Sequence, residues 1–132
     1  MSTTPTKTNS ERPAIMLRLP WPPSVNRYWR HNRGMTHISR EGRHYRDRVA
    51  VECDLRRVVA FEGRLAVQII AYPPDRRKRD LDNVLKALLD ALEYGGCYVD
   101  DSQIDQLTIV RAPKVTGGSV TVTMREIAVE SH

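Results

Sequence analysis

Hydrophobic positions divide the chain into short segments that have the periods of strands and helices. Runs rich in β-branched and aliphatic residues predict strands over 14–19, 65–72, 106–112 and 119–127. Apolar residues that recur every three to four positions predict one helix over about 40–61 and another over about 80–95. A glycine pair at 117–118 predicts that the last two strands form a β-hairpin. Residues 26–40 show neither period and are predicted to form a loop.

The two predicted helices have recognisable ends and apolar faces. Ser39 is expected to cap the first helix and Gly63 to end it, with an apolar face that comprises Tyr45, Val49, Cys53, Leu55 and Val59. Asp80 is expected to cap the second helix, and Gly95 with Gly96 to end it. The apolar stripe of this helix comprises Leu81, Val84, Leu85, Leu88 and Leu92.

This order of elements predicts an α+β fold in which a small mixed β-sheet is covered by two main helices. The length of 132 residues suits a single domain, which we place at 14–128 behind a polar, flexible arm at 1–13. No apolar run reaches the roughly 18 residues of a membrane span, and the start lacks the apolar stretch of a secretory signal. We therefore expect a cytoplasmic protein without membrane association. Cys53 and Cys97 form no C-x-x-C pair, which favours reduced thiols over a zinc site.

Charge is unevenly distributed along the chain. Residues 1–79 hold 17 basic and 7 acidic side chains, whereas residues 80–132 hold 4 basic and 9 acidic ones. A basic half suggests a polyanionic partner. A bound cation would let the acidic half tolerate that partner.

Acidic residues gather around the second helix in a pattern that suits a hard cation. Asp80 and Asp82 lie at its start, Lys86 follows Asp82 by one turn on the same face, and Asp100 and Asp101 come soon after its end. If the 100–101 turn folds back beside the helix start, three carboxylates meet. Mg²⁺ prefers such oxygen ligands and would suit phosphodiester hydrolysis, with Lys86 stabilising negative charge.

A purely structural interpretation of the same residues stays open at this stage. Asp80 can be only a helix cap, and Asp82, Lys86 and Asp90 can form an ordinary ladder of i, i+4 ion pairs. Charged helix faces are commonly just solvated.

The basic segment has the composition of a nucleic-acid-binding surface, because arginines bind phosphates and aromatic rings stack on bases. Its members are Arg27, Arg30, Arg33, Arg40, Arg43, Arg46 and Arg48, with Tyr28, Trp29 and Tyr45 among them. The alternative is a solvated basic face. His31, His37 and His44 also occur here, but the chain lacks H-E-x-x-H and G-x-S-x-G, so a histidine metal site or a serine triad has no local support. Phosphate-binding glycine loops are absent too, which argues against a nucleotide cofactor.

Several ordered motifs together make the chain resemble the RusA family of Holliday-junction resolvases, small endodeoxyribonucleases of bacteria and their phages. These motifs are L-P-W-P-P-S at 19–24 with N-R-Y at 26–28, R-H-N-R-G at 30–34, P-D-R-R-K-R-D-L-D-N at 74–83, and D-D at 100–101. The arm before Pro13 and the last few residues fall outside the likeness.

The resemblance implies a Mg²⁺-dependent homodimer that binds four-way DNA junctions by shape and nicks two strands symmetrically, with Mn²⁺ expected to substitute. The family's metal ligands fall on Asp80, Asp82 and Asp101, and its catalytic lysine falls on Lys86. Asp90 and Asp100 are assigned to support or structure. DNA contacts are expected from Arg27, Arg30, Arg33, Arg76, Arg77, Lys78 and Arg79. Two alternatives remain, a non-catalytic nucleic-acid-binding module and a metal nuclease that acts on RNA or unbranched DNA.

Overall fold

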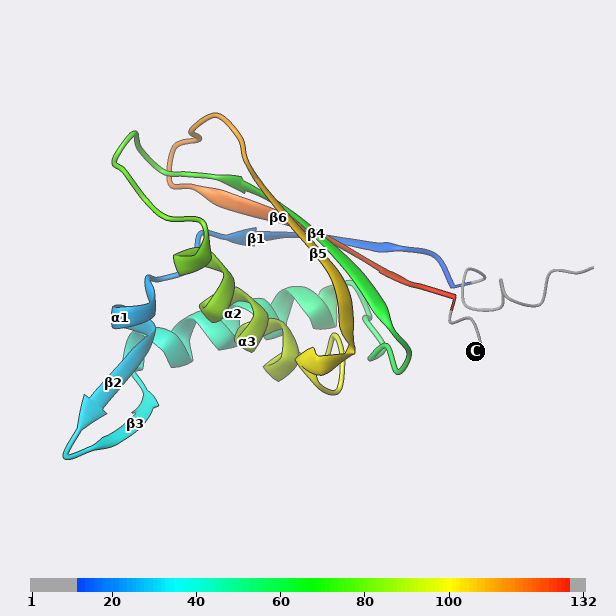
Figure 1. The fold of residues 1–132 in the computed structure, drawn as a ribbon, viewed down its shortest axis with the longest axis horizontal. Helices are drawn as coiled ribbons and strands as arrows, with labels where there is room; N and C mark the ends of the chain where they lie inside the picture. The colour runs from blue at the N-terminus through cyan, green and yellow to red at the C-terminus, as the bar shows by residue number, and fades with distance from the viewer. Residues whose placement is uncertain (1–11, 129–132) are drawn as a thin grey trace, which may run out of the picture.

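The computed structural model describes residues 12–128, so the predicted arm lies outside the described residues except for its last two positions. The elements in chain order are β1 (Ile15–Pro20), α1 (Val25–Tyr28), β2 (Trp29–Asn32), β3 (Met35–Ile38), α2 (Arg40–Leu55), β4 (Leu65–Tyr72), α3 (Asp82–Tyr94), the 3₁₀ turn η2 (Asp101–Gln103), β5 (Ile104–Arg111) and β6 (Ser119–Glu126). The predicted α+β class is confirmed, with a mixed sheet covered by two main helices (Figure 1).

The main sheet has the strand order β1-β6-β4-β5. Strand β6 is antiparallel to both β1 and β4, whereas β5 is parallel to β4. The predicted hairpin of the last two strands is therefore wrong. Helix α3 carries the chain back over the sheet, so β5 joins the free side of β4 in parallel, and β6 must then pair on the other side of β4.

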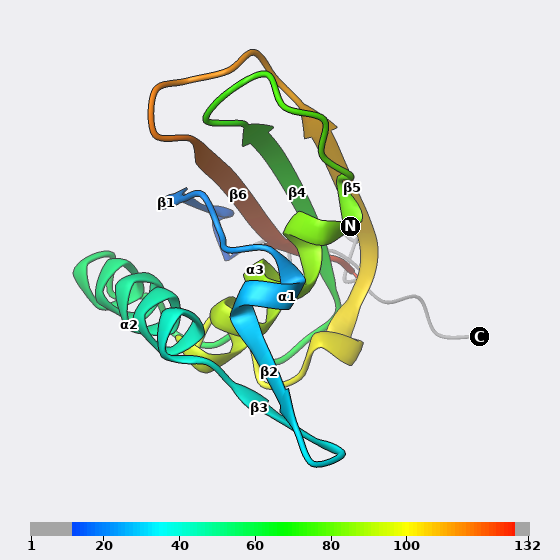
Figure 2. The ribbon, with the colours of Figure 1, turned by 90° about the vertical axis from the view of Figure 1, so that its left-hand side faces the viewer.

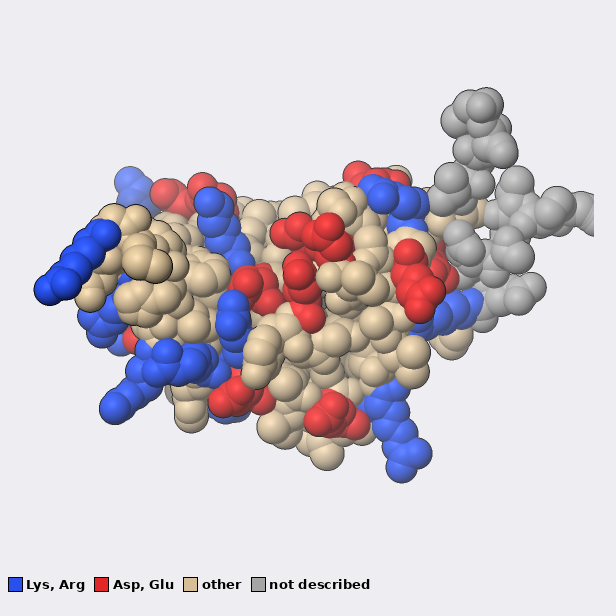
Figure 3. Space-filling view, turned by 90° about the horizontal axis from the view of Figure 1, so that it is seen from below, with Lys and Arg blue, Asp and Glu red and all other residues tan. Residues whose placement is uncertain are grey.

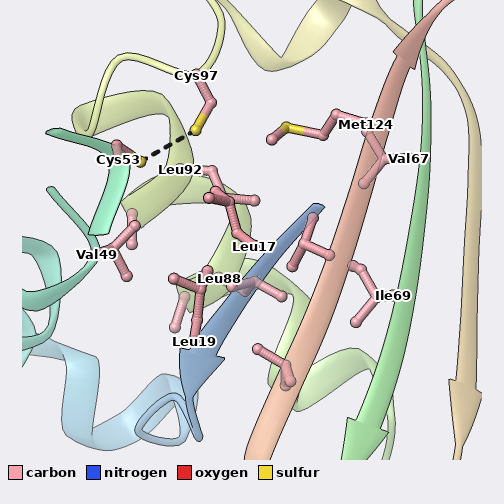
Figure 4. Packing of buried hydrophobic residues seen from close by; sticks show 14 of the residues in the cluster. Leu17, Leu19, Val49, Cys53, Val67, Ile69, Leu88, Leu92, Cys97 and Met124 are labelled. Atoms are coloured by element: carbon pink, nitrogen blue, oxygen red, sulfur yellow. Dashed lines mark hydrogen bonds between the residues drawn. The ribbon is translucent and has the colours of Figure 1, made fainter. Parts of the chain in front are cut away.

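Both main helices cover one face of this sheet, and the core lies between the two layers (Figures 1 and 2). Alternation directs every second strand residue toward the helices, as Leu17, Leu19, Val67 and Ile69 illustrate. Leu88 and Leu92 of α3 meet them from the other layer, together with Val49 of α2 (Figure 4). Cys53 and Cys97 are buried free thiols with their sulfurs 3.3 Å apart.

Helix α2 begins as predicted but ends six residues early. The Ser39 hydroxyl accepts a hydrogen bond from the Gly42 amide at 2.9 Å, which confirms the cap. Tyr45, Val49 and Cys53 are buried at four-residue spacing. Leu55 and Val59 are exposed, contrary to the prediction. Position 55 is rotated about 200° from position 53 on a helix, and the chain leaves the helix at Arg56–Arg57, where Arg57 has a φ of 54°.

The segment predicted as a loop is instead structured. Residues 25–28 form the short helix α1, and β2 pairs with β3 as a separate two-stranded hairpin that projects from the helix layer (Figure 2). Its two-residue turn holds Arg33 and Gly34 at φ values of 53° and 76°, the left-handed pair that a tight hairpin turn requires.

Helix α3 follows the predicted stripe but begins two residues later than expected. Leu81 occupies the cap position and Asp80 makes no side-chain cap, so the prediction that Asp80 caps the helix is wrong. Gly95 and Gly96 end the helix as predicted, with Gly96 at a φ of 88°. Among residues 12–128, no helix combines the length and the apolar character needed to cross a membrane.

Candidate active site and nucleic-acid groove

The loop between β4 and α3 carries the basic run and is held in place by its own aspartate. Asp75 accepts hydrogen bonds from the Arg77 amide at 2.9 Å and from both terminal nitrogens of Arg79, at 2.7 and 3.1 Å. The Arg79 side chain and the Arg77 amide lower the pKa of Asp75 below its ordinary value. Arg79 also lies over the Trp21 ring, 5.8 Å from its centre. Arg79, which is predicted to contact DNA, therefore stabilises the conformation of the loop. The other three basic residues of the run, Arg76, Arg77 and Lys78, are exposed.

This basic loop separates two open grooves. The larger one, of about 990 Å³, lies between the loop, the proline-rich turn at 20–24 and the first half of α2. Its charged and amide lining comprises Arg27, Glu41, Arg48, Asp75, Arg77, Lys78, Arg79, Asp80 and Asn83. The smaller one, of about 530 Å³, lies on the other side of the loop, with Arg76, Arg111 and Lys114 among its residues. A basic ridge with grooves on both sides suits a sugar-phosphate backbone.

Asp80, Asp82 and Lys86 lie at or near the start of α3, and all three are exposed. Asp82 is the first helical residue and Lys86 follows one turn later on the same face. Within residues 12–128, the ion pairs shorter than 4.0 Å include neither Asp82 nor Lys86. The ladder of ion pairs that a structural role predicts is therefore not formed.

Asp90, the other member of that hypothetical ladder, belongs to a different network. Its Oδ2 lies 2.8 Å from Arg46 Nη2 and 2.9 Å from Arg46 Nε, and it accepts the Tyr28 hydroxyl proton. Burial and the Asp90 hydrogen bond raise the pKa of Tyr28, so the hydroxyl stays protonated. Asp90 thus ties α1 and α2 to α3, which supports its assignment to structure.

Asp100 and Asp101 lie at η2, where the chain is built around one buried glutamine. Gln103 accepts the amide protons of residues 99 and 100 at 2.8 and 2.9 Å and donates to the carbonyls of Phe61 and Gly63, both at 2.9 Å. The Asp100 carboxylate accepts the Ser102 hydroxyl and amide, which lower the pKa of Asp100. These contacts explain Asp100 as a capping residue and leave Asp101 exposed.

Asp101 groups with a residue that the sequence interpretation missed. Carboxylate oxygens of Glu93, Asp100 and Asp101 all lie within 4.8 Å of one another. Glu93 stands in the last turn of α3, and its place two residues before the glycine pair is the only sequence signal that could have identified it. In the described part of the chain this is the only such cluster of three acidic, histidine or cysteine ligands. The histidines therefore join no metal-ligand group there.

The two halves of the predicted metal site lie at opposite ends of α3. Asp82 begins the helix and Glu93, next to Asp101, ends it, so about 16 Å of helix separates them. The expectation that the 100–101 turn folds back beside the helix start is therefore wrong within one chain. Six fully extended residues could span about 20 Å, but the connection turns at Gly96 and pairs Tyr98 with Phe61, so Asp101 stays beside Glu93 at the helix end.

The donor atoms nevertheless fit a divalent metal. Every candidate ligand is a carboxylate, and each is exposed, so the oxygens can reorient toward an ion. Oxygen-only ligands select hard cations such as Mg²⁺ or Mn²⁺ over zinc. In the view from below, acidic side chains gather over the middle of the molecule while basic side chains crowd the end that carries the hairpin (Figure 3).

Known proteins resemble the chain over most of its length. The sequence model of the family described as "Endodeoxyribonuclease RusA" matches residues 20–125. A relative named "Crossover junction endodeoxyribonuclease RusA", from Escherichia coli strain K12, is 44% identical over 115 residues, covering 86% of this chain and 96% of that protein. The protein of that name from Enterobacteria phage 82 shows the same identity and coverage. Both grooves and all the acidic residues described above lie inside the matched stretch.

Proposed function

The chain belongs to the RusA family of endodeoxyribonucleases, and on this premise we propose that it is a Mg²⁺-dependent nuclease that resolves four-way DNA junctions by paired symmetric nicks. The observation that carries the proposal is the start of α3. There Asp80 lines a basic groove, and Asp82 and Lys86 are exposed without the ion pairs of a structural ladder. Exposed carboxylates beside a phosphate-binding surface need a cation to tolerate the substrate.

The nuclease chemistry of the family implies a divalent metal, and we infer Mg²⁺ as that metal, with Mn²⁺ able to replace it. When bound, such an ion would supply positive charge to the scissile phosphate and would make an attacking water more acidic. Asp80, Asp82 and Asp101 would hold it through carboxylate oxygens. Lys86, one turn from Asp82, places its ammonium group where negative charge develops on the phosphate. Asp100 supports the turn that presents Asp101.

We infer that the complete site needs two copies of the chain. Because about 16 Å of helix separates Asp82 from the Asp101 cluster, one chain offers only half of the ligands at each end of α3. In a two-fold dimer with antiparallel α3 helices, the start of one helix meets the end of the other, and two equivalent sites form. Apolar side chains near the end of α3 suit this contact, because Tyr94, Val99 and Leu107 are 57%, 65% and 41% exposed.

The dimer also agrees with the reaction. A four-way junction is approximately two-fold symmetric, and two equivalent sites would cut two strands at matching positions. The basic loop 76–79 with Arg27 and Arg48 would hold the backbone beside each site, through contacts that carry little base information. We accordingly place the protein in the cytoplasm, where its DNA substrate lies.

The experiment is cleavage of an end-labelled four-way junction with Mg²⁺, with linear duplex as competitor. Three proteins are compared: the unmodified chain, Asp80→Asn, and Asp47→Asn, which removes an exposed carboxylate of α2 outside the grooves. We expect paired symmetric nicks from the unmodified chain and from Asp47→Asn, and junction binding without nicks from Asp80→Asn. Binding by all three without any metal-dependent cutting would support the non-catalytic module instead. Equal cutting of linear duplex would point to a nuclease without junction selectivity.

A further inference from the structure

The β2–β3 hairpin has a surface that no feature of the metal site explains. Every residue from Arg30 to His37 is exposed, and Met35, beside the turn, keeps 70% of its surface in water. The hairpin projects from the end of the helix layer rather than lying on it (Figures 1 and 2). Residues 29–38 include two arginines and no acidic residue.

The pairing register gives the hairpin two distinct faces. Trp29 pairs with Ile38, and both pack against the core, so this face looks toward the protein. Arg30 pairs with His37 and Asn32 pairs with Met35, and alternation directs these residues to the opposite face. The outward face thus carries a cation near its base and an apolar side chain near its tip.

The base of the hairpin is firmly braced. The Ser39 amide and hydroxyl both donate to the Tyr28 carbonyl, at 2.9 and 3.0 Å. Arg46 lies beside the Tyr28 and Trp29 rings, 6.0 Å from each ring centre, and is itself held by Asp90. These contacts at the base, together with the two-residue turn, make the hairpin rigid, so its tip can keep its conformation when it contacts a partner.

We propose that this hairpin is a wedge that inserts Met35 between bases at the branch point of the junction, while Arg30 and Arg33 hold the flanking phosphates. The inference rests on the proposed function. Apolar side chains that enter base steps do so at the cost of unstacking, and that cost is smallest where pairing is already interrupted. Four residues per strand extend about 13 Å, which exceeds the roughly 8.5 Å depth of a major groove. Two arginines and no carboxylate make the ribbon complementary to DNA.

The test measures base unstacking, with 2-aminopurine placed beside the branch point of a four-way junction. Binding is carried out with Mg²⁺ in an Asp82→Asn background, so that no cutting intervenes. Met35→Ser is compared with Met16→Ser, since Met16 is a 57% exposed methionine on β1, remote in the fold from the hairpin. Neither change alters charge, and neither residue is buried. A Met35→Phe variant restores an apolar wedge.

We expect the parent, Met16→Ser and Met35→Phe to raise the 2-aminopurine fluorescence on binding. Met35→Ser should bind the junction with similar affinity but leave the fluorescence near that of free junction. Full enhancement by Met35→Ser would overturn the proposal, as would an equal loss in Met16→Ser. Failure of the proposed function shows separately, as a protein with intact Asp82 that neither prefers nor cuts the junction.

Discussion

The contacts of Asp90 indicate a structural role, in contrast to the metal-binding role proposed for Asp80 and Asp82. It accepts one hydrogen bond from Arg46 Nε at 2.9 Å and one from the Tyr28 hydroxyl, and it forms an ion pair with Arg46 Nη2 at 2.8 Å, in a site where the Asp90 and Arg46 side chains are 30% and 22% exposed. Asp90→Ala removes both hydrogen bonds and the ion pair, and it leaves the guanidinium only partly hydrated. Hydrogen bonds to charged groups contribute about 1.5–3 kcal/mol each, and partial exposure weakens them.

We therefore expect Asp90→Ala to lower the free energy of unfolding by about 2 kcal/mol. The free energy of unfolding of a domain is about 5–15 kcal/mol, so the variant should stay folded and continue to cut junctions. Asp82→Asn should behave oppositely, because its side chain is exposed at the first helical position. Its unfolding free energy should change by less than about 1 kcal/mol, whereas its cutting should be abolished.

The assay pairs urea unfolding with junction cleavage on the same preparations of both variants. A double-mutant cycle with Arg46→Ala then measures the coupling energy between Arg46 and Asp90, which should be about 1–3 kcal/mol. The reasoning is refuted if Asp90→Ala stops cutting while its unfolding curve stays unchanged, since Asp90 would then act in the reaction rather than in the fold.

Four further outcomes follow from particular contacts. Gln103→Ala leaves four backbone groups unpaired, so it should lower the free energy of unfolding in urea by about 3 kcal/mol. It should also weaken cutting, because it loosens the turn that carries Asp101. Gly42→Ala should cost about 1–3 kcal/mol in thermal unfolding, because its Cβ would lie 2.5 Å from a carbonyl oxygen of α1. In NMR titrations the Asp75 carboxyl should show a pKa below the ordinary pKa of an aspartate. The stability that Asp75 contributes is therefore present at a pH above the ordinary pKa and disappears as the pH falls through the lowered pKa. Arg79→Gln should move the titration midpoint of Asp75 back upward. Arg77→Gln should reduce the slope of log affinity against log salt by about 0.9, measured by junction binding at several salt concentrations.

Long periodic segments were predictable from the sequence because burial of one face dictates their pattern. Strand β4 and helix α3 follow their apolar positions closely, and the Ser39 cap follows from side-chain chemistry. The hairpin was missed because both of its faces carry polar residues, so its four-residue strands have no hydrophobic alternation. The partner of β5 was mispredicted because pairing depends on the route of the α3 crossover, which local turn residues do not encode.

The candidate site was only half predictable for a related reason. The residue types and the position of Lys86 follow from spacing along one helix. Whether Asp101 meets Asp82 depends on the path of the chain after α3, and a turn at Gly96 leaves Asp101 beside Glu93 at the far end of that helix. Spacing in the sequence therefore predicts candidate ligands but does not predict which chain would supply each of them.

The most direct test of the central claim, a metal site shared between two chains, is complementation between two inactive variants. Cleavage of a four-way junction in the presence of Mg²⁺ is measured for Asp80→Asn alone and for Asp101→Asn alone. It is then measured for an equal mixture of the two variants that has been unfolded and refolded together. If the sites are shared, each mixed dimer combines both defects in one site and keeps the other intact. Random pairing then restores about a quarter of the unmodified number of sites, and they make single nicks rather than paired ones. A refolded mixture as inactive as either variant alone would contradict the shared site.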